Sequence, residues 1–331
     1  RGPGIASIRR PMSSSFLEAV EHRSVAARRS IPLAAETAEA AAARGMRSHA
    51  TFAYRGVEVA YSELPDAQSN LLFGNVLWPC AEVLSRLLVD AAKGGAKVWT
   101  PAACAQLGLP LEMLLSRRFG VKVEPLLGPS GVDRLGLETL IPDVSEGTSV
   151  LEVGAGVGVT GLVCHALGAR VLLTDGEARL VDALLHQQRA AAGEPTDRLR
   201  IELLDWHVEA ARPRSDSHGE QSQEECFRLI LGCEVLNPAC EGEVQVPRVI
   251  ARRLEKARGA RALLLSQVRR VATCQAALRE LESHGLAVAA FRVCNGREAF
   301  EISRDLEQLV PSEQDGAHLL LVAAWPTRTV T

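Results

Sequence analysis

The sequence predicts an α/β fold in which an open, mostly parallel sheet is covered by helices on both faces. From Gly147 onward, short apolar runs alternate with segments whose apolar residues recur at helical spacing. This alternation is typical of parallel strands joined by crossover helices, because helices on both faces bury strands that are apolar throughout. A glycine-rich turn directly after the first of these runs is a second observation that favours the same fold.

Seven apolar runs are the predicted strands of this sheet. In chain order they are SVLEV, ARVLLTD, LRIELLD, FRLILGCEV, ARALLLSQV, LAVAAFRV and HLLLVAAW. Helical patterns separate them near residues 158–168, 178–192, 243–257 and 272–284. The segment between the last two runs is too irregular for a full crossover helix, so we expect these two strands to pair antiparallel at the sheet edge. The predicted fold is therefore a Rossmann-like, seven-stranded, mostly parallel sheet with an antiparallel last strand.

Two further segments precede this core, which we place at residues 148–327. Residues 51–92 predict a β-hairpin around Arg55-Gly56 and then a helix that begins near Pro79, both packed on the core. Residues 93–147 carry scattered Pro and Gly without clear periodicity, and we interpret them as an insertion or linker.

Residues 1–50 are rich in Ala, Arg and Ser and hold more Arg than acid. This composition is typical both of organelle transit peptides and of disordered tails. We expect a disordered or targeting tail here, and the bias leaves import into an organelle open beside a cytoplasmic location.

Composition narrows the function classes. The formal net charge of −3 gives no support for a nucleic-acid partner, and no apolar run approaches the ~20 residues that span a membrane. The eight cysteines form no C-x-x-C pair, which argues against a metal site and for a reducing compartment. We expect a cytoplasmic protein that acts as a monomer and binds neither nucleic acid nor membrane.

The segment EVGAGVGVTG contains two overlapping glycine patterns. GVGVTG, from Gly156, matches the turn of a dinucleotide site, whereas EVGAG, from Glu152, matches that of an S-adenosylmethionine site with its Gly154-Ala155-Gly156 turn. A dinucleotide site directs the turn and the helix N-terminus at a pyrophosphate. S-adenosylmethionine has no phosphate and brings a sulfonium and an ammonium. Glu152 would attract these cations and would repel a pyrophosphate, so it favours S-adenosylmethionine.

Acidic residues at the ends of the next two strands extend this interpretation. Asp175, followed by Gly176, can accept hydrogen bonds from both ribose hydroxyls of either cofactor. Asp205 and Trp206 offer a hydrogen-bond acceptor and an aromatic face where an adenine would lie. Together they favour S-adenosylmethionine, and an NAD(P)-dependent oxidoreductase stays the remote alternative.

Five spaced motifs carry a resemblance to a known family: LWPCAEVLSRLL, VLEVGAGVGVTGLVCHALGARVLLTDGE, LLDW, LILGCEVLNP and LLLSQVRR. From about Phe52 to Trp325, apart from residues 93–147, the chain resembles the class I, seven-strand protein-lysine methyltransferases that modify chaperones, elongation factors and calmodulin. The resemblance implies S-adenosylmethionine as cofactor and a protein as substrate. It also implies cofactor contacts from the glycine turn and from four further residues, Trp78, Asp175, Trp206 and Cys233.

The acceptor motif departs from the family pattern. After the fourth strand the family usually carries an aspartate, two apolar residues and a tyrosine, where this chain has Glu234 and Asn237. We expect both to be catalytic, with Glu234 holding the acceptor amine and Asn237 offering a hydrogen bond. Arg269-Arg270, at the end of the fifth strand, could meet an acidic substrate segment or remain solvated.

Three functions follow from this departure. The chain is a lysine methyltransferase with a modified pocket, a methyltransferase that acts on another acceptor (histidine, an N-terminal amine or a small molecule), or a cofactor-binding protein with little activity. The first is favoured because the family motifs persist on both sides of the change.

Overall fold

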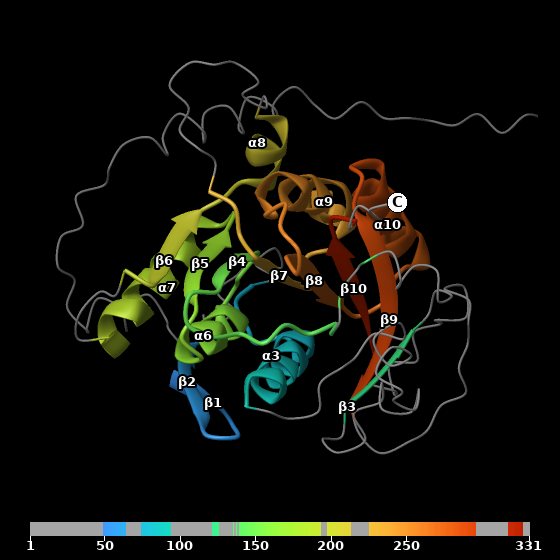
Figure 1. Ribbon diagram of the computed structural model, residues 1–331. Helices are drawn as coiled ribbons and strands as arrows, with labels where there is room; N and C mark the ends of the chain where they lie inside the picture. The colour runs from blue at the N-terminus through green and yellow to red at the C-terminus, as the bar shows by residue number, and fades with distance from the viewer. Residues whose placement is uncertain are drawn as a thin grey trace, which may run out of the picture. The chain divides into compact units, whose positions relative to one another are not determined.

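In the computed structural model of the protein, a mixed sheet lies between two layers of helices (Figure 1). All described residues belong to the unit Gly45–Thr331. The structure describes residues 49–63, 74–93, 121–125, 135, 137, 139–192, 197–212, 225–295 and 317–326. The predicted tail at 1–50 therefore lies almost entirely outside the described residues.

The main sheet has eight described strands in the order β3-β9-β10-β8-β7-β4-β5-β6. They are β3 (Val121–Pro125), β4 (Ser149–Val153), β5 (Arg170–Asp175), β6 (Leu199–Leu203), β7 (Leu229–Cys233), β8 (Arg261–Ser266), β9 (Ala287–Asn295) and β10 (Ala317–Ala324). Strands β6, β5, β4, β7 and β8 pair in parallel, and β10 is antiparallel to both β8 and β9. The seven predicted strands and the antiparallel last strand are confirmed.

Strand β3 is the addition that the sequence did not predict. It pairs antiparallel with β9 at the sheet edge, from Val121 opposite Asn295 to Pro125 opposite Phe291. It lies inside residues 93–147, and Leu140, from the same segment, is 1% exposed in the main hydrophobic cluster. Part of the predicted insertion thus contributes to the sheet and the core, while the domain boundaries themselves stay a prediction.

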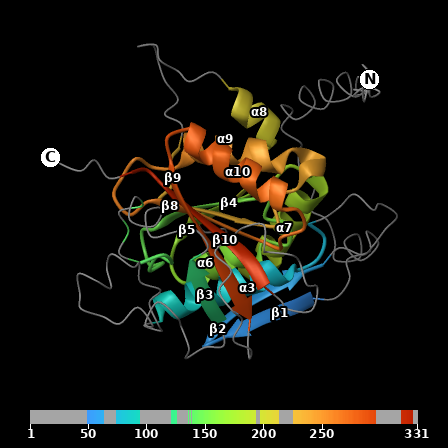
Figure 2. The ribbon, with the colours of Figure 1, turned by 90° about the vertical axis from the view of Figure 1, so that its right-hand side faces the viewer.

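Helices cover both faces of the sheet (Figures 1 and 2). On one face lie α3 (Pro79–Ala92), α6 (Val159–Ala166) and α7 (Ala178–Ala192). On the other lie α8 (Trp206–Ala211), α9 (Gly242–Arg253) and α10 (Val271–Ser283), with a short 3-10 helix, η2 (Pro238–Cys240), before α9. The four predicted crossover helices correspond to α6, α7, α9 and α10.

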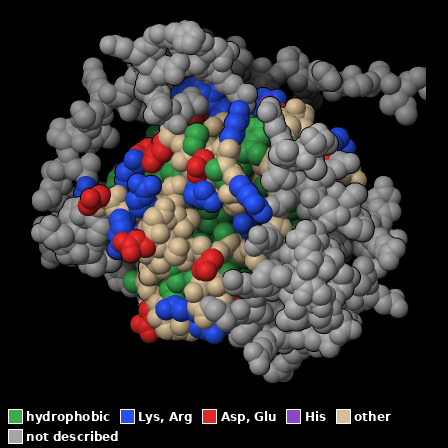
Figure 3. Space-filling model, viewed as in Figure 1, with side chains coloured by type: hydrophobic (Ala, Val, Ile, Leu, Met, Phe, Trp, Pro, Cys, Tyr) green, Lys and Arg blue, Asp and Glu red, His purple; other side chains and the backbone are tan. Residues whose placement is uncertain are grey.

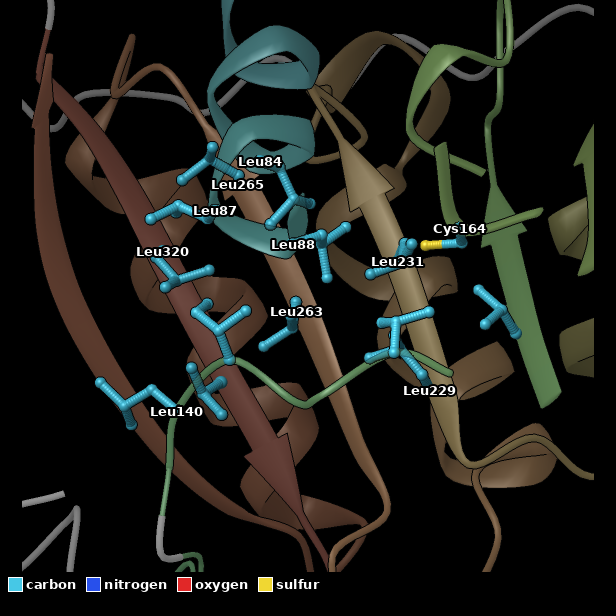
Figure 4. Packing of buried hydrophobic residues seen from close by; sticks show 14 of the residues in the cluster. Leu84, Leu87, Leu88, Leu140, Cys164, Leu229, Leu231, Leu263, Leu265 and Leu320 are labelled. Atoms are coloured by element: carbon cyan, nitrogen blue, oxygen red, sulfur yellow. The ribbon is translucent and has the colours of Figure 1, made fainter. Parts of the chain in front are cut away.

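Strand β8 shows how the two cores arise from one strand. Its side chains alternate between faces because successive residues of a strand point in opposite directions. Leu263 and Leu265 join the cluster under α3, whereas Ala262 and Leu264 join the cluster under α9 and α10. Figure 4 shows leucines of α3 facing those of β7, β8 and β10 in the first cluster. Every residue of β8 is buried, which explains why its central residues 262–265 are apolar without alternation.

The N-terminal hairpin and helix are also confirmed. Strands β1 (His49–Tyr54) and β2 (Val57–Ser62) pair antiparallel around Arg55-Gly56, whose φ angles of 48° and 76° suit a tight hairpin turn. Helix α3 begins at Pro79, where the missing N–H of proline costs no helical hydrogen bond. The chain before α3 lies against the glycine turn after β4, so this segment helps to build the site.

Candidate cofactor and acceptor site

A cavity of about 790 Å³ lies at the carboxyl ends of the parallel strands. The chain leaves β4 toward β5 on one side and returns to β7 on the other, which is where open α/β sheets bind ligands. All twelve site residues predicted from the sequence line this one cavity: Trp78, Glu152, Gly154, Ala155, Gly156, Asp175, Gly176, Asp205, Trp206, Cys233, Glu234 and Asn237. Its volume is in the range of small-molecule and cofactor sites.

The glycine turn after β4 requires its glycines for two reasons. Gly154 and Gly156 have φ angles of 62° and 54°, where a side chain is disfavoured. A Cβ on Gly156 would also lie 2.8 Å from the carbonyl oxygen of Gly74, and one on Gly154 would lie 3.0 Å from the indole of Trp206. The backbone is therefore open toward the cavity but tightly packed on its other sides.

Asp175 is fixed at the end of β5 by backbone donors. Its Oδ2 accepts the N–H of Gly156 at 2.9 Å, and its Oδ1 accepts the N–H of Glu177 at 3.0 Å. Burial raises the pKa of the Asp175 carboxyl, and these N–H groups oppose that shift. Each oxygen keeps a second lone pair, so the carboxylate can accept two ligand hydroxyls.

Glu152 lies deeper, at 3% exposure. Its Oε2 accepts the N–H of Gly161 in the first turn of α6 at 2.8 Å. Burial raises the pKa of Glu152 to about 8 despite that hydrogen bond. A cation placed beside this carboxyl would favour its ionised form, which is the property expected of a contact to a sulfonium or an ammonium.

Asp205 and Trp206 differ in how much of their hydrogen-bonding capacity stays available to a ligand. Oδ1 of Asp205 accepts the N–H groups of His207 at 2.8 Å and Val208 at 3.3 Å, and so caps α8. That Asp205 accepts a hydrogen bond from adenine therefore stays a prediction, and only its other oxygen, Oδ2, is left for it. The indole of Trp206 packs against the Gly154 turn, and its buried Nε1 has no hydrogen-bond partner among the described residues.

Glu234 is held in an unusual conformation after β7. Its φ of 56° is left-handed, which costs of order 1 kcal/mol or more for a residue with a side chain. Oε1 accepts the N–H of Gln267 at 2.7 Å, and Oε2 lies 3.5 Å from Nη2 of Arg269. The guanidinium of Arg269 also stacks over the ring of Trp78, 5.2 Å from its centroid. Burial raises the pKa of Glu234, and Gln267 and Arg269 oppose the shift.

Two other predicted residues have local structural partners. Oδ1 of Asn237 accepts the N–H of Ala239 at 3.0 Å and caps η2, so its catalytic role stays a prediction. The thiol of Cys233 lies 3.8 Å from the hydroxyl of Thr160 and also contacts Cys80. Both side chains line the cavity, but part of their hydrogen-bonding capacity is used by the fold.

Sequence reasoning missed several residues of the cavity wall. Gly74 lies against Gly156, because a Cβ on Gly74 would be 2.9 Å from the Cα of Gly156. Ser266, Gln267 and Thr273 line the cavity from the end of β8 and the start of α10. The position after a parallel strand was the available signal for the β8 residues, whereas nothing local marked Gly74.

The described residues give three further findings. In them no group of three or more His, Cys, Asp or Glu side chains is arranged to hold a metal ion. None of the helices in the described ranges is long and apolar enough to cross a membrane. Acidic and basic side chains are intermixed on the described part of the face shown in Figure 3.

Several solved methyltransferases are similar to the chain. A TehB-like S-adenosylmethionine-dependent methyltransferase from Corynebacterium glutamicum has 19% identity and a TM-score of 0.35, over 68% of this chain and 93% of that chain. Magnesium protoporphyrin IX methyltransferase from Synechocystis, solved with bound S-adenosylmethionine, has 14% identity and a TM-score of 0.36, over 54% and 71%. A comparison with curated protein sequences found no match.

A family model described as lysine methyltransferase matches residues 66–220. The matched range includes Glu152 and Asp205-Trp206, which are the residues that favoured S-adenosylmethionine over NAD(P). The predicted cofactor and enzyme class are confirmed. The chain is therefore a class I S-adenosylmethionine-dependent methyltransferase, and its residues 66–220 match the model of the lysine methyltransferase family.

Proposed function

We propose that the chain transfers a methyl group from S-adenosylmethionine to a lysine side chain of a protein substrate. The observation that carries this proposal is the position of Glu234, whose largely buried carboxylate lines the same cavity as the glycine turn and Asp175. We call residues 152–158, 175–177 and 204–207 the cofactor half of the cavity. Residues 234–240 and 266–274 form the acceptor half. Trp78 and Cys233 are counted with the cofactor half, because the family resemblance implies cofactor contacts from them.

In the cofactor half, each proposed contact uses a group that the fold leaves available. The second lone pairs of the Asp175 carboxylate take the ribose hydroxyls, and the indole of Trp206 faces the adenine. Glu152 lies on the side of the turn toward α6, and its carboxyl takes the cationic methionine end. This arrangement directs the sulfonium methyl toward the acceptor half.

The chemical step is an in-line displacement. The lone pair of the lysine nitrogen attacks the methyl carbon, the new N–C bond forms as the S–C bond breaks, and the electron pair returns to sulfur to give S-adenosylhomocysteine. The lysine must lose its ammonium proton before it can attack. The protein mainly aligns the two reactants and excludes water, so few groups need to change their protonation state.

Glu234 is the proposed partner of the acceptor amine. Burial raises the pKa of its carboxyl, which makes it a better proton acceptor than a solvated glutamate. The N–H of Gln267 and the guanidinium of Arg269 hold the two oxygens, so the carboxylate has a defined orientation toward the cavity. A substrate amine that enters the cavity can then donate a hydrogen bond to this carboxylate, which fixes the direction of the amine.

Amino-acid analysis of labelled protein tests this proposal. A cell lysate is incubated with tritiated-methyl S-adenosylmethionine and the wild type, Glu234→Gln or, as control, Glu282→Gln on the exposed side of α10. We expect label in methyllysine for the wild type and the control, and its loss with Glu234→Gln. Label in methylhistidine, at N-terminal amines or only in small molecules would show that the acceptor is not lysine.

A further inference from the structure

The acceptor half contains a buried hydroxyl that the proposed methyl transfer does not use. Ser266, at the end of β8, is 3% exposed and lines the cavity. Its Oγ has no hydrogen-bond partner among the described residues. A buried hydroxyl without a partner destabilises the fold, because it has lost its hydrogen bonds to water and gained none in return. The simplest reason for such a group in a cavity wall is a ligand that completes its hydrogen bond.

The first turn of α10, which begins five residues after Ser266, lines the same cavity. Its N-cap residue is Arg270, which makes no side-chain capping bond, and the first turn contains no acidic residue. Thr273 and Cys274 of this turn line the cavity. The N–H of Thr273 already donates to the carbonyl of Arg270 at 3.2 Å. The dipole of this uncapped helix start is therefore the feature of the turn that favours an anion.

Arginine side chains add full positive charge at this place. Arg269 is 51% exposed and already contacts Glu234 and Trp78. Arg270 is exposed, lines the cavity and forms no ion pair with another described residue. The acceptor half also contains a carboxylate, that of Glu234, but this group is already paired with Arg269. Arg270 is therefore the arginine of this wall that is left to attract an anion. A lysine ammonium that approached the two arginines alone would be repelled.

We propose that Ser266, Arg270 and the first turn of α10 form an anion subsite that binds a substrate carboxylate next to the methyl-accepting lysine. The inference rests on the proposed lysine methylation and names the class of substrate, a lysine within an acidic sequence. The acidic neighbour neutralises Arg270, accepts the hydroxyl of Ser266 and offsets the repulsion between the arginines and the incoming ammonium. Because Arg270 is exposed, the attraction weakens as salt concentration rises.

Peptide binding tests the subsite directly. Two fluorescein-labelled peptides differ only in that the residues flanking a central lysine are Glu in one and Gln in the other. Fluorescence anisotropy is measured with S-adenosylhomocysteine present, for the wild type, Arg270→Gln, Ser266→Ala and, as matched control, the exposed Arg279→Gln further along α10.

We expect the wild type to bind the Glu peptide about tenfold more tightly at low salt, as one charge-assisted contact provides. That preference should largely disappear in Arg270→Gln, fall by a few-fold in Ser266→Ala and stay unchanged in Arg279→Gln. Equal binding of the two peptides to the wild type, binding of neither, or a preference retained in Arg270→Gln would overturn the subsite.

Methyl transfer measured on the same samples separates this inference from the proposed function. A charge preference that depends on Arg270, without formation of methyllysine, would support the subsite and count against lysine as the acceptor. Methyllysine formed equally in both peptides, with no difference in binding, would support the proposed function and refute the subsite.

Discussion

The two halves of the cavity differ in how their polar groups are held. In the cofactor half, Asp175 accepts two backbone N–H groups and Glu152 accepts one. In the acceptor half, one backbone N–H and the side chain of an exposed arginine hold the two oxygens of Glu234. Each half also has a buried polar atom without a partner among the described residues, Nε1 of Trp206 and Oγ of Ser266. Backbone donors thus fix the carboxylates of the cofactor half in advance, whereas an exposed side chain helps to hold that of the acceptor half.

The largest expected effect comes from the close packing of the cofactor half. Gly156→Ala places a Cβ 2.8 Å from the carbonyl oxygen of Gly74 and should abolish detectable S-adenosylmethionine binding in calorimetric titration. Gly147→Ala is the matched control, because its φ of 85° imposes a similar strain but its Cβ would meet nothing within 4 Å. The control should lose only about 1–2 kcal/mol of unfolding free energy. Equal cofactor binding by both variants would show that the close packing of Gly74 against Gly156 is not needed for cofactor binding.

The second largest effect is expected at Glu234, where a substitution should affect methyl transfer but not cofactor binding. Glu234→Gln keeps the shape of the side chain and removes its charge, so methyl transfer should fall by roughly 10²–10³-fold while the Kd for S-adenosylmethionine stays unchanged. Single-turnover transfer of labelled methyl groups and calorimetry measure the two quantities. Transfer at the wild-type rate would show that Glu234 does not act on the amine.

The third effect is expected at Asp175, where a substitution should affect cofactor binding but not the rate of methyl transfer. Asp175→Asn removes the charge from the proposed ribose acceptor and should weaken cofactor binding about 100-fold, as expected for two charge-assisted hydrogen bonds. The transfer rate at saturating cofactor should change little. Asp182→Asn, at an exposed position of α7, is the control. An unchanged Kd for S-adenosylmethionine in Asp175→Asn would show that the ribose hydroxyls do not bind Asp175.

The smallest effect concerns the dependence of stability on pH. The pKa of Glu152 is raised to about 8 in the folded protein from an ordinary value of 4.5, so the unfolded chain loses this proton first as the pH rises. Without cofactor, this group should lower the unfolding free energy between about pH 4.5 and pH 8, by at most about 1.4 kcal/mol per pH unit. Urea unfolding at several pH values should show a shallower decline in Glu152→Gln than in the wild type. Identical slopes of unfolding free energy against pH in the two proteins would contradict the raised pKa of Glu152.

The cofactor half could be predicted from the sequence because its signals are local. Glycines after a strand, an acid at the end of the next strand and Asp-Trp after the third each follow from chain order in an α/β sheet. The predicted roles of Asp205 and Asn237 took no account of a competing use. Both residue types are common helix caps, and in the structure their oxygens cap α8 and η2.

The remaining features depend on contacts between distant parts of the chain. Strand β3 pairs with β9, about 170 residues later, and an edge strand of five residues leaves little periodicity to detect. The contact of Gly74 with Gly156 and the unpartnered hydroxyl of Ser266 arise only when the layers pack. Glu234 and Asn237 of the acceptor half could still be named from the sequence, whereas the unpartnered hydroxyl of Ser266 and the edge strand β3 become visible only in the three-dimensional structure.

A crystal structure of the protein with S-adenosylhomocysteine tests the division of the cavity most directly. We predict that the ribose hydroxyls donate to Asp175, that the adenine packs against Trp206 and that the sulfur points toward the side of the cavity where Glu234 lies. A ligand bound in the reverse direction, with its adenine beside Glu234 and Arg269, would contradict it.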